Sequence, residues 1–393
     1  MRIDTTLAER TKKVIPSSTL TITAKAKRLK AEGKDIISLA AGEPDFDTPD
    51  FVKNAAIEAI KAGFTKYTPT TGIPELKRAI CEKFKRENSL EYQSSQIVVS
   101  CGAKHSIFNT LLALVNKNDE VMIPSPYWVS YPEMVNICEG KAKIISTKAD
   151  NNFKLSIAEV EKYISVKTKV LILNSPSNPA GTVYGLKDLK EIASLCVKKK
   201  IFVISDEIYE KLIYDGIKHY SIAALNKDIH ELTITINGLS KSFSMTGWRI
   251  GYLGASQEIV DTISKLQDHS TSNPTSIAQK AGVAALTAPG DFFNSIREEF
   301  SRRRDYCLGR LDKMEKLSYV KPQGAFYIFC NISKTGLDSV TFSNRLLDEE
   351  FVAIIPGKGF GKDDYARISF AAGIEQLEKA MDRLESWLKK IKA

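Results

Sequence analysis

The stretch Ile201-Phe202-Val203-Ile204-Ser205-Asp206 places an apolar, β-branched run directly before a carboxylate. A run of this length and composition is typical of a strand that is buried on both faces of a sheet. Similar runs occupy residues 97–99, 120–123, 170–173, 232–236 and 249–253. Helix-period segments, such as residues 186–199, lie between several of them. This alternation predicts an α/β fold whose mostly parallel sheet is covered on both faces and binds ligands at the carboxyl ends of its strands.

The pattern changes after about residue 287. Apolar residues at spacings of three and four predict a long helix over residues 291–316 and a final helix over residues 374–391. Short strands are expected over residues 325–332, 352–355 and 367–371. The N-terminal segment holds a helix pattern over residues 23–32 and is too short to fold alone, so we expect it to pack on the C-terminal part. The 393 residues are therefore expected to form a large domain (48–286) and a small α+β domain (1–47 with 287–393).

The charge of the chain is positive, with 56 Lys+Arg against 47 Asp+Glu and a net charge of +9. Such a surplus could attract nucleic acid or smaller anions. The basic residues are scattered, and their short runs lie on segments with helix periodicity, which indicates solvated helix faces rather than a nucleic-acid surface. The 4 histidines lack the HExxH spacing of a zinc hydrolase, so we predict no metal site.

The cysteines and the apolar runs indicate the compartment. The 6 cysteines are widely spaced and form no CxxC pair, which favours reduced thiols over disulfides or a zinc ribbon. No apolar run approaches the roughly 18 residues of a membrane span, and the N-terminus lacks the apolar core of a signal peptide. We therefore expect a cytoplasmic protein without membrane contact.

Polar side chains stand at the ends of four of the predicted strands. They are Asn178, Asp206 with Tyr209, Ser240 with Lys241, and Arg249. If these strands are neighbours in one sheet, an amide, a carboxylate, an amine and a guanidinium converge on one cleft. Each residue taken singly has an ordinary explanation as a helix cap, a surface lysine or half of an ion pair. The ordered combination indicates a ligand site.

These groups suit pyridoxal phosphate, which carries a ring nitrogen, a phenolic oxygen, an aldehyde and a phosphate. The amine of Lys241 would bond the aldehyde, and Asp206 would keep the ring nitrogen protonated. Asn178 and Tyr209 would hydrogen-bond the phenolic oxygen. The arginine and the serine of the set would hold the phosphate, together with backbone amides at the start of a helix.

A series of short motifs runs in fixed order along nearly the whole chain. They are Ala41-Gly42-Glu43-Pro44-Asp45-Phe46, Lys66-Tyr67-Thr68-Pro69, Pro126-Tyr127-Trp128, Asn178-Pro179-Ala180-Gly181, Ser205-Asp206-Glu207-Ile208-Tyr209, Ser240-Lys241 and Gly247-Trp248-Arg249-Ile250-Gly251. The series resembles the class I aminotransferases among the fold-type I pyridoxal phosphate enzymes. It is most similar to the prokaryotic aspartate aminotransferases related to aspartate/prephenate aminotransferases. The resemblance implies a large domain with a mostly parallel sheet of the seven-stranded type between helices, and a smaller α+β domain.

The resemblance also implies roles for individual residues. The implied catalytic residues are Lys241, Asp206 and Tyr209. The implied cofactor-binding residues are Gly102, Ala103, Lys104, Trp128, Asn178, Asp206, Tyr209, Ser240, Lys241 and Arg249, with Tyr67 reaching the phosphate from the other subunit. The implied substrate-binding residues are Gly42, Trp128, Asn178, Arg367, Lys104, Ser17 and Thr19. A residue that crosses between subunits implies an obligate homodimer with shared active sites.

The implied activity is that of an aspartate aminotransferase. An amino group would pass between L-aspartate or L-glutamate and 2-oxoglutarate or oxaloacetate in a ping-pong reaction, with Lys241 as general base and acid. The planar fork of Arg367 would bind the substrate α-carboxylate. Relatives that also use prephenate carry a lysine where this chain has Ile15, and an apolar side chain cannot hold a carboxylate. The small residues Cys101 and Ala103 depart from the usual pattern but fit the start of a helix.

Three alternatives remain open from the sequence. The aminotransferase could have a broader range that includes prephenate or aromatic substrates. The same fold and cofactor could serve a lyase reaction instead. The fold could also be retained in a regulator that binds nucleic acid, although no helix-turn-helix segment precedes residue 40.

Overall fold

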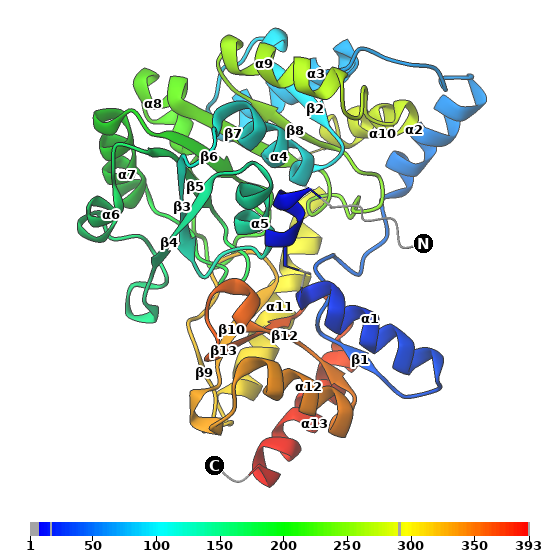
Figure 1. Cartoon of the computed structure of the whole chain (residues 1–393). Coiled ribbons are helices and arrows are strands. Elements are labelled where there is room, and N and C mark those ends of the chain that lie inside the picture. Colours follow the sequence, from blue (N-terminus) through cyan, green and yellow to red (C-terminus); the bar gives the residue numbers. More distant parts are fainter. Residues whose placement is uncertain (1–7, 16–17, 290–291, 392–393) are drawn as a thin grey trace, which may run out of the picture.

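A computed structural model describes residues 8–15, 18–289 and 292–391 of the chain. Its main feature is a seven-stranded sheet with the order β2-β8-β7-β6-β5-β3-β4 (Figure 1). The strands are β2 (Ile97–Ser100), β3 (Glu120–Ser125), β4 (Lys141–Ser146), β5 (Thr168–Asn174), β6 (Phe202–Asp206), β7 (Thr233–Gly238) and β8 (Gly251–Gly254). All neighbouring pairs are parallel except those of β8, which is antiparallel to both β7 and β2. The predicted α/β fold with a mostly parallel sheet is confirmed.

The central strands are apolar throughout because helices cover both faces of the sheet. Val170 and Ile172 of β5 face a core shared with α4 (Ala103–Leu114), α5 (Ser130–Ile137) and α9 (Gln257–Asp268). The alternate residues Leu171 and Leu173 face a second core shared with α6 (Ile157–Tyr163), α7 (Leu186–Lys199) and α8 (Lys227–Leu232). Successive residues of a strand point to opposite faces, so a doubly covered strand needs apolar residues at every position.

The outer end of the sheet, at β2 and β8, packs against three more helices. They are α2 (Asp50–Lys61), α3 (Pro74–Lys83) and α10 (Ser276–Leu286), which share one core with Ile97, Val99 and Tyr252. A π-helical turn, η2 (Phe84–Asn88), continues α3 directly. At the opposite edge lies β4, which the sequence did not reveal. Its exposed Lys141 and its half-buried positions are typical of an edge strand, so it lacks the apolar run that identified the inner strands.

A smaller antiparallel sheet lies below the large one in Figure 1. Its order is β12-β13-β10-β9, from β9 (Ser318–Tyr319), β10 (Tyr327–Asn331), β12 (Ile355–Pro356) and β13 (Tyr365–Ser369). It packs with α11 (Phe292–Leu311), α12 (Ser339–Glu350) and α13 (Ile374–Lys390) around a core of buried aromatic and aliphatic residues. The expected packing of the N-terminal segment on this part is confirmed, because β1 (Ile37–Ser38) pairs with β11 (Val352–Ala353) and α1 (Ser18–Ala31) shares a core with β12.

Two predicted boundaries in this part are wrong. The helix expected over residues 291–316 ends at Leu311, where the amides of Lys313 and Met314 bond to carbonyls three residues back and the chain turns. The turn lets Met314 and Leu317 enter the core, so the apolar spacing continues beyond the helix. The strand expected over residues 352–355 is divided into β11 and β12, which pair with β1 and β13 respectively.

The short remaining elements complete the chain. They are the 3-10 turns η1 (Glu9–Lys13), η3 (Ser94–Gln96), η4 (Ala149–Asn151), η5 (Ile222–Ala224), η6 (Ser333–Thr335) and η7 (Gly357–Phe360). Within the described ranges, none of the helices combines the length and the apolar character that crossing a bilayer requires.

Substitution of Phe300 tests how much the core around the smaller sheet contributes to stability. Its ring, fully buried on α11, contacts Phe46, Phe326 and Phe370 at centroid distances of 5.4, 5.6 and 6.3 Å. Phe300→Ala removes these contacts and leaves a cavity, so we expect the free energy of unfolding to fall by about 3–5 kcal/mol in urea denaturation. The control Val166→Ala, at a fully exposed position, is expected to change it by less than about 0.5 kcal/mol. Equal stabilities of the two variants would contradict the buried position of Phe300.

Candidate active site

A cavity of about 340 Å³ lies at the edge of the large sheet that faces the smaller sheet. The strand directions bring its residues together. Parallel strands β5, β6 and β7 end at this edge, and the antiparallel strand β8 begins there. The segments that follow β5, β6 and β7 therefore meet the segment that precedes β8, as the sequence predicted.

Most of the predicted site residues line this cavity. They are Gly42, Ala103, Lys104, Trp128, Asn178, Asp206, Tyr209, Ser240, Lys241, Arg249 and Arg367. Gly102 is the N-cap of α4, and its neighbour Ala103 lines the cavity. Ser17 lies outside the described residues, and so does the side chain of Thr19.

Tyr67 does not line the cavity of its own chain. Its side chain is 92% exposed on the irregular segment between α2 and α3. Ile15 is 70% exposed, and its amide donates to Glu133 Oε2 of α5 at 2.9 Å.

Asp206 is a buried carboxylate at the last position of β6. The phenol of Tyr131 donates to its Oδ2 at 2.6 Å, and the amide of Ile208 donates to its Oδ1 at 3.2 Å. Its own carbonyl accepts from Asn174 Nδ2 at 2.9 Å, which fixes the end of the strand. Burial raises the pKa of Asp206 to about 6, and the hydrogen bond from Tyr131 opposes that rise. Asp206 can therefore hold or release a proton near neutral pH.

Lys241 follows β7 and points its amine into the same cavity. The ammonium donates to the carbonyl of Gly42 and lies 6.0 Å from the ring centroid of Phe326. The pKa of Lys241 is lowered to about 8, chiefly by burial and also by the cations of Arg367 and Arg249, while Glu43 and Asp206 oppose the shift. About a tenth of this amine is neutral at a pH of about 7, far more than of an ordinary lysine. Lys241 is thus suited to act as a nucleophile and a base.

One end of the cavity lies where β8 meets α4. Gly251 touches the start of α4 so closely that an added Cβ would lie 2.1 Å from the amide nitrogen of Ala103. Gly102 has a φ of +87°, and a Cβ there would lie 2.5 Å from Arg249 Nη2. Arg249 also has a positive φ, of 56°, which is uncommon for a residue with a side chain. The guanidinium and the first free amides of a 12-residue helix therefore face the same space.

Trp128 forms one wall of the cavity. Its ring makes an edge contact with Tyr131 at 5.3 Å, and the ammonium of Lys104 lies 4.8 Å from its centroid. Partial burial lowers the pKa of Lys104, and the charge of Arg249 adds to this effect. A flat aromatic wall beside cationic groups suits a planar, anionic ligand.

Arg367 lies at the opposite side, on β13 of the smaller sheet, and is 2% exposed. Its Nη1 donates to Asn178 Oδ1 at 3.0 Å, its Nη2 donates to the carbonyl of Ala40 at 2.8 Å, and its guanidinium lies 4.2 Å from the ring centroid of Tyr327. Within residues 8–15, 18–289 and 292–391, no carboxylate pairs with it and its buried Nε has no hydrogen-bond partner. A buried cation without a counter-charge is costly, so this position favours an anionic ligand.

Three residues of this site were missed from the sequence. Tyr131 bonds Asp206, Asn174 bonds both the carbonyl of Asp206 and the amide of Asn178, and Tyr327 meets the phenol of Tyr209 at 2.9 Å. Tyr131 lies three residues after Trp128, at the start of α5, and this short spacing is the signal that could have revealed it. Tyr327 stands in an apolar strand sequence and looks like a core aromatic residue.

The reactivity of Lys241 tests these electrostatics. We expect reductive methylation of the ligand-free protein with dilute formaldehyde to modify Lys241 with a midpoint near pH 8, because its pKa is lowered to about 8. Exposed lysines as a class are expected to react with a midpoint of about 10.4. Peptide mass spectrometry measures both in one sample. A Lys241 midpoint in the range of the exposed lysines would contradict its buried, cationic surroundings.

The chain is similar to known proteins over nearly its whole length. The family model described as aminotransferase class I and II matches residues 34–384. An aspartate aminotransferase of Bacillus sp. (strain YM-2) is 46% identical over 388 residues, which cover 98% of this chain and 99% of that protein. A probable aspartate/prephenate aminotransferase of Aquifex aeolicus is 45% identical over 391 residues, with coverage of 98% and 99%. The solved structure of Thermus thermophilus aspartate aminotransferase with maleate is 41% identical with a TM-score of 0.94, covering 97% of this chain and 99% of that one. The chain therefore belongs to the class I and II aminotransferase family.

Proposed function

We propose that this protein is a pyridoxal phosphate-dependent aspartate aminotransferase that exchanges amino groups between L-aspartate or L-glutamate and their 2-oxo acids. One observation carries the proposal: the low-pKa amine of Lys241 and the buried guanidinium of Arg367, which has no carboxylate partner among the described residues, line one cavity. An α-amino acid carries an amine and a carboxylate on the same carbon. A site that binds the carboxylate at Arg367 brings that carbon toward Lys241.

The residues present fit pyridoxal phosphate. The start of α4, with Arg249 and Ser240, offers amides, a guanidinium and a hydroxyl to a phosphate. The buried carboxylate of Asp206 suits a protonated ring nitrogen, and Asn178 with Tyr209 suits a phenolic oxygen. Trp128 offers a flat face, and Lys241 offers the amine that bonds an aldehyde. When bound, the cofactor supplies an electron sink for bond breaking at the substrate Cα.

The side chains of this chain account for the remaining steps. Arg367 binds the substrate α-carboxylate and orients Cα, while Asn178 holds the guanidinium in place. Lys241 Nζ would accept the proton from Cα as a general base and, as a general acid, would return it to the carbon that the bound cofactor supplies on the other side of the amino nitrogen. Asp206 favours the protonated ring nitrogen because its charge is buried and supported by Tyr131. The hydroxyls of Tyr209, in the turn after β6, and of Tyr327, on β10 of the smaller sheet, share a hydrogen bond of 2.9 Å that joins the two sides of the cavity.

An acidic substrate side chain is the second part of the proposal. Lys104 lines the cavity and supplies a cation, and Ser17 and Thr19 are proposed to add hydroxyls. The Bacillus and Thermus relatives, named for aspartate, support this choice, and one of them was solved with maleate. The Aquifex relative is named for both aspartate and prephenate. Ile15 stands where relatives that use prephenate carry a lysine, and its apolar side chain cannot bind a carboxylate. We therefore propose that prephenate is a poor substrate.

We also propose a cytoplasmic homodimer in which Tyr67 reaches the phosphate of the partner's site. The exposed position of Tyr67 supports this arrangement, because the side chain is not needed to complete its own subunit. The 6 cysteines are free, which is compatible with a reducing compartment. The domain division at 48–286 against 1–47 and 287–393 remains part of the proposal, with the two sheets as its two cores.

Removing the Lys241 amine tests the cofactor and the reaction together. In Lys241→Ala, amino transfer from aspartate to 2-oxoglutarate is expected to fall by roughly 10²–10⁴-fold, because the proton at Cα loses its base. Borohydride is expected to attach the cofactor to the Lys241 peptide of the wild type and to no peptide of the variant, as measured by mass spectrometry. The control Lys187→Ala, on the exposed surface of α7, should behave as the wild type. Ammonia release in place of glutamate formation by the wild type would favour the lyase alternative.

The substrate range is tested with one preparation, using aspartate, glutamate and the amino product of prephenate as donors and prephenate itself as an acceptor. We expect aspartate and glutamate to react at least about tenfold more efficiently, in kcat/KM, than prephenate or its amino product, because no cation stands at Ile15. Ile15→Lys should raise the prephenate value and leave the aspartate value nearly unchanged. Efficient prephenate turnover by the wild type would contradict the role given to this position.

A further inference from the structure

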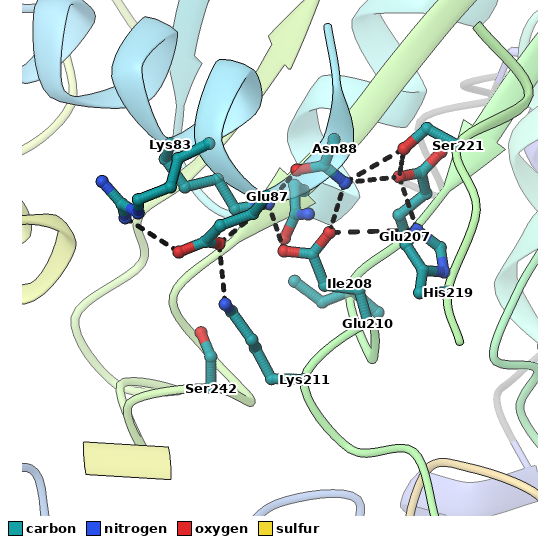
Figure 2. A network of polar contacts seen from close by, with 12 residues as sticks. Lys83, Glu87, Asn88, Glu207, Ile208, Glu210, Lys211, His219, Ser221 and Ser242 are labelled. Carbon is teal, nitrogen blue, oxygen red and sulfur yellow. Dashed lines mark hydrogen bonds and ion pairs between the residues drawn. The ribbon is translucent and has the colours of Figure 1, made fainter. Parts of the chain in front are cut away.

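Figure 2 shows a second polar cluster, and none of its members listed below lines the cavity. It consists of Lys83, Glu87, Asn88, Glu207, Glu210, Lys211, His219 and Ser221. Buried ionic clusters need a complete set of partners to be tolerated. The mechanism above makes no use of any of these residues.

The cluster meets the cavity in the turn that follows β6. Residues 207–211 form neither a helix nor a strand, and their backbone bonds include Glu210 N to Glu207 O at 3.0 Å. Asp206 and Tyr209 line the cavity, whereas the side chains of Glu207 and Glu210 bond into the cluster. One side of the turn therefore carries Asp206 and Tyr209, the proposed cofactor contacts. The other side carries Glu207 and Glu210, which anchor the turn to the cluster.

Glu207 is the best-connected anchor, at 1% exposure. Its Oε2 accepts from Ser221 Oγ at 2.5 Å and from Asn88 Nδ2 at 3.2 Å, and it lies 2.9 Å from His219 Nε2. Its Oε1 accepts from Ser205 Oγ at 2.8 Å, inside β6 itself. The amide of Glu207 also donates to the carbonyl of Ile236 in β7 at 2.9 Å. These bonds tie the end of β6 to three other segments.

Glu210 anchors the other end of the turn. Its Oε1 accepts from the ammonium of Lys83, and its Oε2 accepts from Asn88 Nδ2 at 2.6 Å. Burial alone would raise the pKa of Glu210, but the charges of Lys83, His219 and Lys211 outweigh it and lower the pKa to about 2. Burial alone would lower the pKa of His219. The charges of Glu207 and Glu210 outweigh the effect of burial, so the pKa of His219 is raised. The carboxylates of Glu87, Glu207 and Glu210 thus face the cations of Lys83, Lys211 and Arg86 and the imidazole of His219, whose pKa is raised.

The π-helical turn explains how one helix end supplies two anchors. Lys83 ends α3 and Asn88 ends η2, so they are five residues apart, yet Lys83 Nζ donates to Asn88 Oδ1 at 2.7 Å. In an α-helix, residues three or four apart share a face. The i→i+5 bonding of a π-turn brings residues five apart together, and such turns are frequent at functional sites. Both side chains therefore reach Glu210.

We propose that Glu207 and Glu210, held by Lys83, Asn88, His219 and Ser221, are positioning residues that fix the turn so that Asp206 and Tyr209 meet the cofactor. The inference rests on the proposed function, because it concerns the same site. A turn without regular structure has no ladder or helix to define it, so its side-chain bonds define it instead. A displacement of about 1 Å at a catalytic group can cost roughly 10²-fold in rate.

Two variants of the holoenzyme separate positioning from charge. Glu207→Gln keeps the shape of the side chain but removes its charge, whereas Ser221→Ala removes one donor and leaves the carboxylate in place. Positioning predicts that both lower kcat for aspartate, by about tenfold or more for Glu207→Gln and about threefold or more for Ser221→Ala, with KM changed by less than about threefold. Both should also move the pH midpoint of the visible cofactor band, which depends on Asp206 and on the Tyr131, Lys241 and Glu207 groups that face it.

The matched control is Glu120→Gln at the start of β3. Glu120 Oε2 accepts from Lys143 at 2.9 Å, Ser165 at 2.6 Å and Thr168 at 3.0 Å, so the variant disrupts a comparable network that has no bond to the turn. Its kcat and band midpoint should equal those of the wild type, whatever happens to its melting temperature. Equal losses of kcat in Glu120→Gln and Glu207→Gln would overturn the proposal, because the effect would then follow stability alone.

The remaining outcomes are also decisive. A change in Glu207→Gln with none in Ser221→Ala would show an effect of charge and overturn positioning. If Glu207→Gln does not fold, the folded Ser221→Ala decides: a lower kcat with a moved midpoint supports the proposal, and wild-type behaviour overturns it. Failure of the proposed function is a separate result, because the wild type itself would then transfer no amino group between aspartate and 2-oxoglutarate.

Discussion

The direction of β8 against its neighbours is the constraint on which the site depends. Asp206 ends β6, Lys241 follows β7 and Arg249 precedes β8, so only a reversed β8 brings all three to one edge. The same strand approaches the start of α4 closely enough to require Gly251. Burial at this edge then brings the pKa of the carboxylate of Asp206 up to about 6 and that of the amine of Lys241 down to about 8. Topology thus determines which groups meet, and burial determines their protonation.

The smaller sheet completes the cavity with a charge of its own. Arg367 of β13 is buried against Tyr327 and bonds Asn178, which follows β5 of the large sheet. A guanidinium that has no carboxylate partner in the described ranges is a costly feature for a stable core. An amino-acid substrate offers the missing carboxylate. The same contact therefore joins the two sheets and favours the substrate class.

Much of this architecture could be predicted from the sequence, because buried strands and polar residues at their ends leave clear patterns. The inner strands, α7 and the cavity residues that follow or precede those strands keep to these patterns, whereas Gly42, Lys104, Trp128 and Arg367 were expected only from the resemblance to a known family. The edge strand β4 and the end of α11 do not, since exposure and a tight turn break the link between apolar spacing and structure. Tyr131 was hidden among helix residues, and Asn88 meets Glu210 only because a π-turn brings residues five apart together. The roles of the site residues stay predictions, and Ser17 and the side chain of Thr19 lie outside the described residues.

We expect this cavity to perform amino transfer as two separate half-reactions. Rapid mixing of the holoenzyme with aspartate alone, followed by quantification of oxaloacetate and ammonia, tests it most directly. We expect one equivalent of oxaloacetate per chain, no ammonia, and no further turnover until 2-oxoglutarate is added. Continued product formation without an oxo acid, or ammonia in place of a retained amino group, would contradict it.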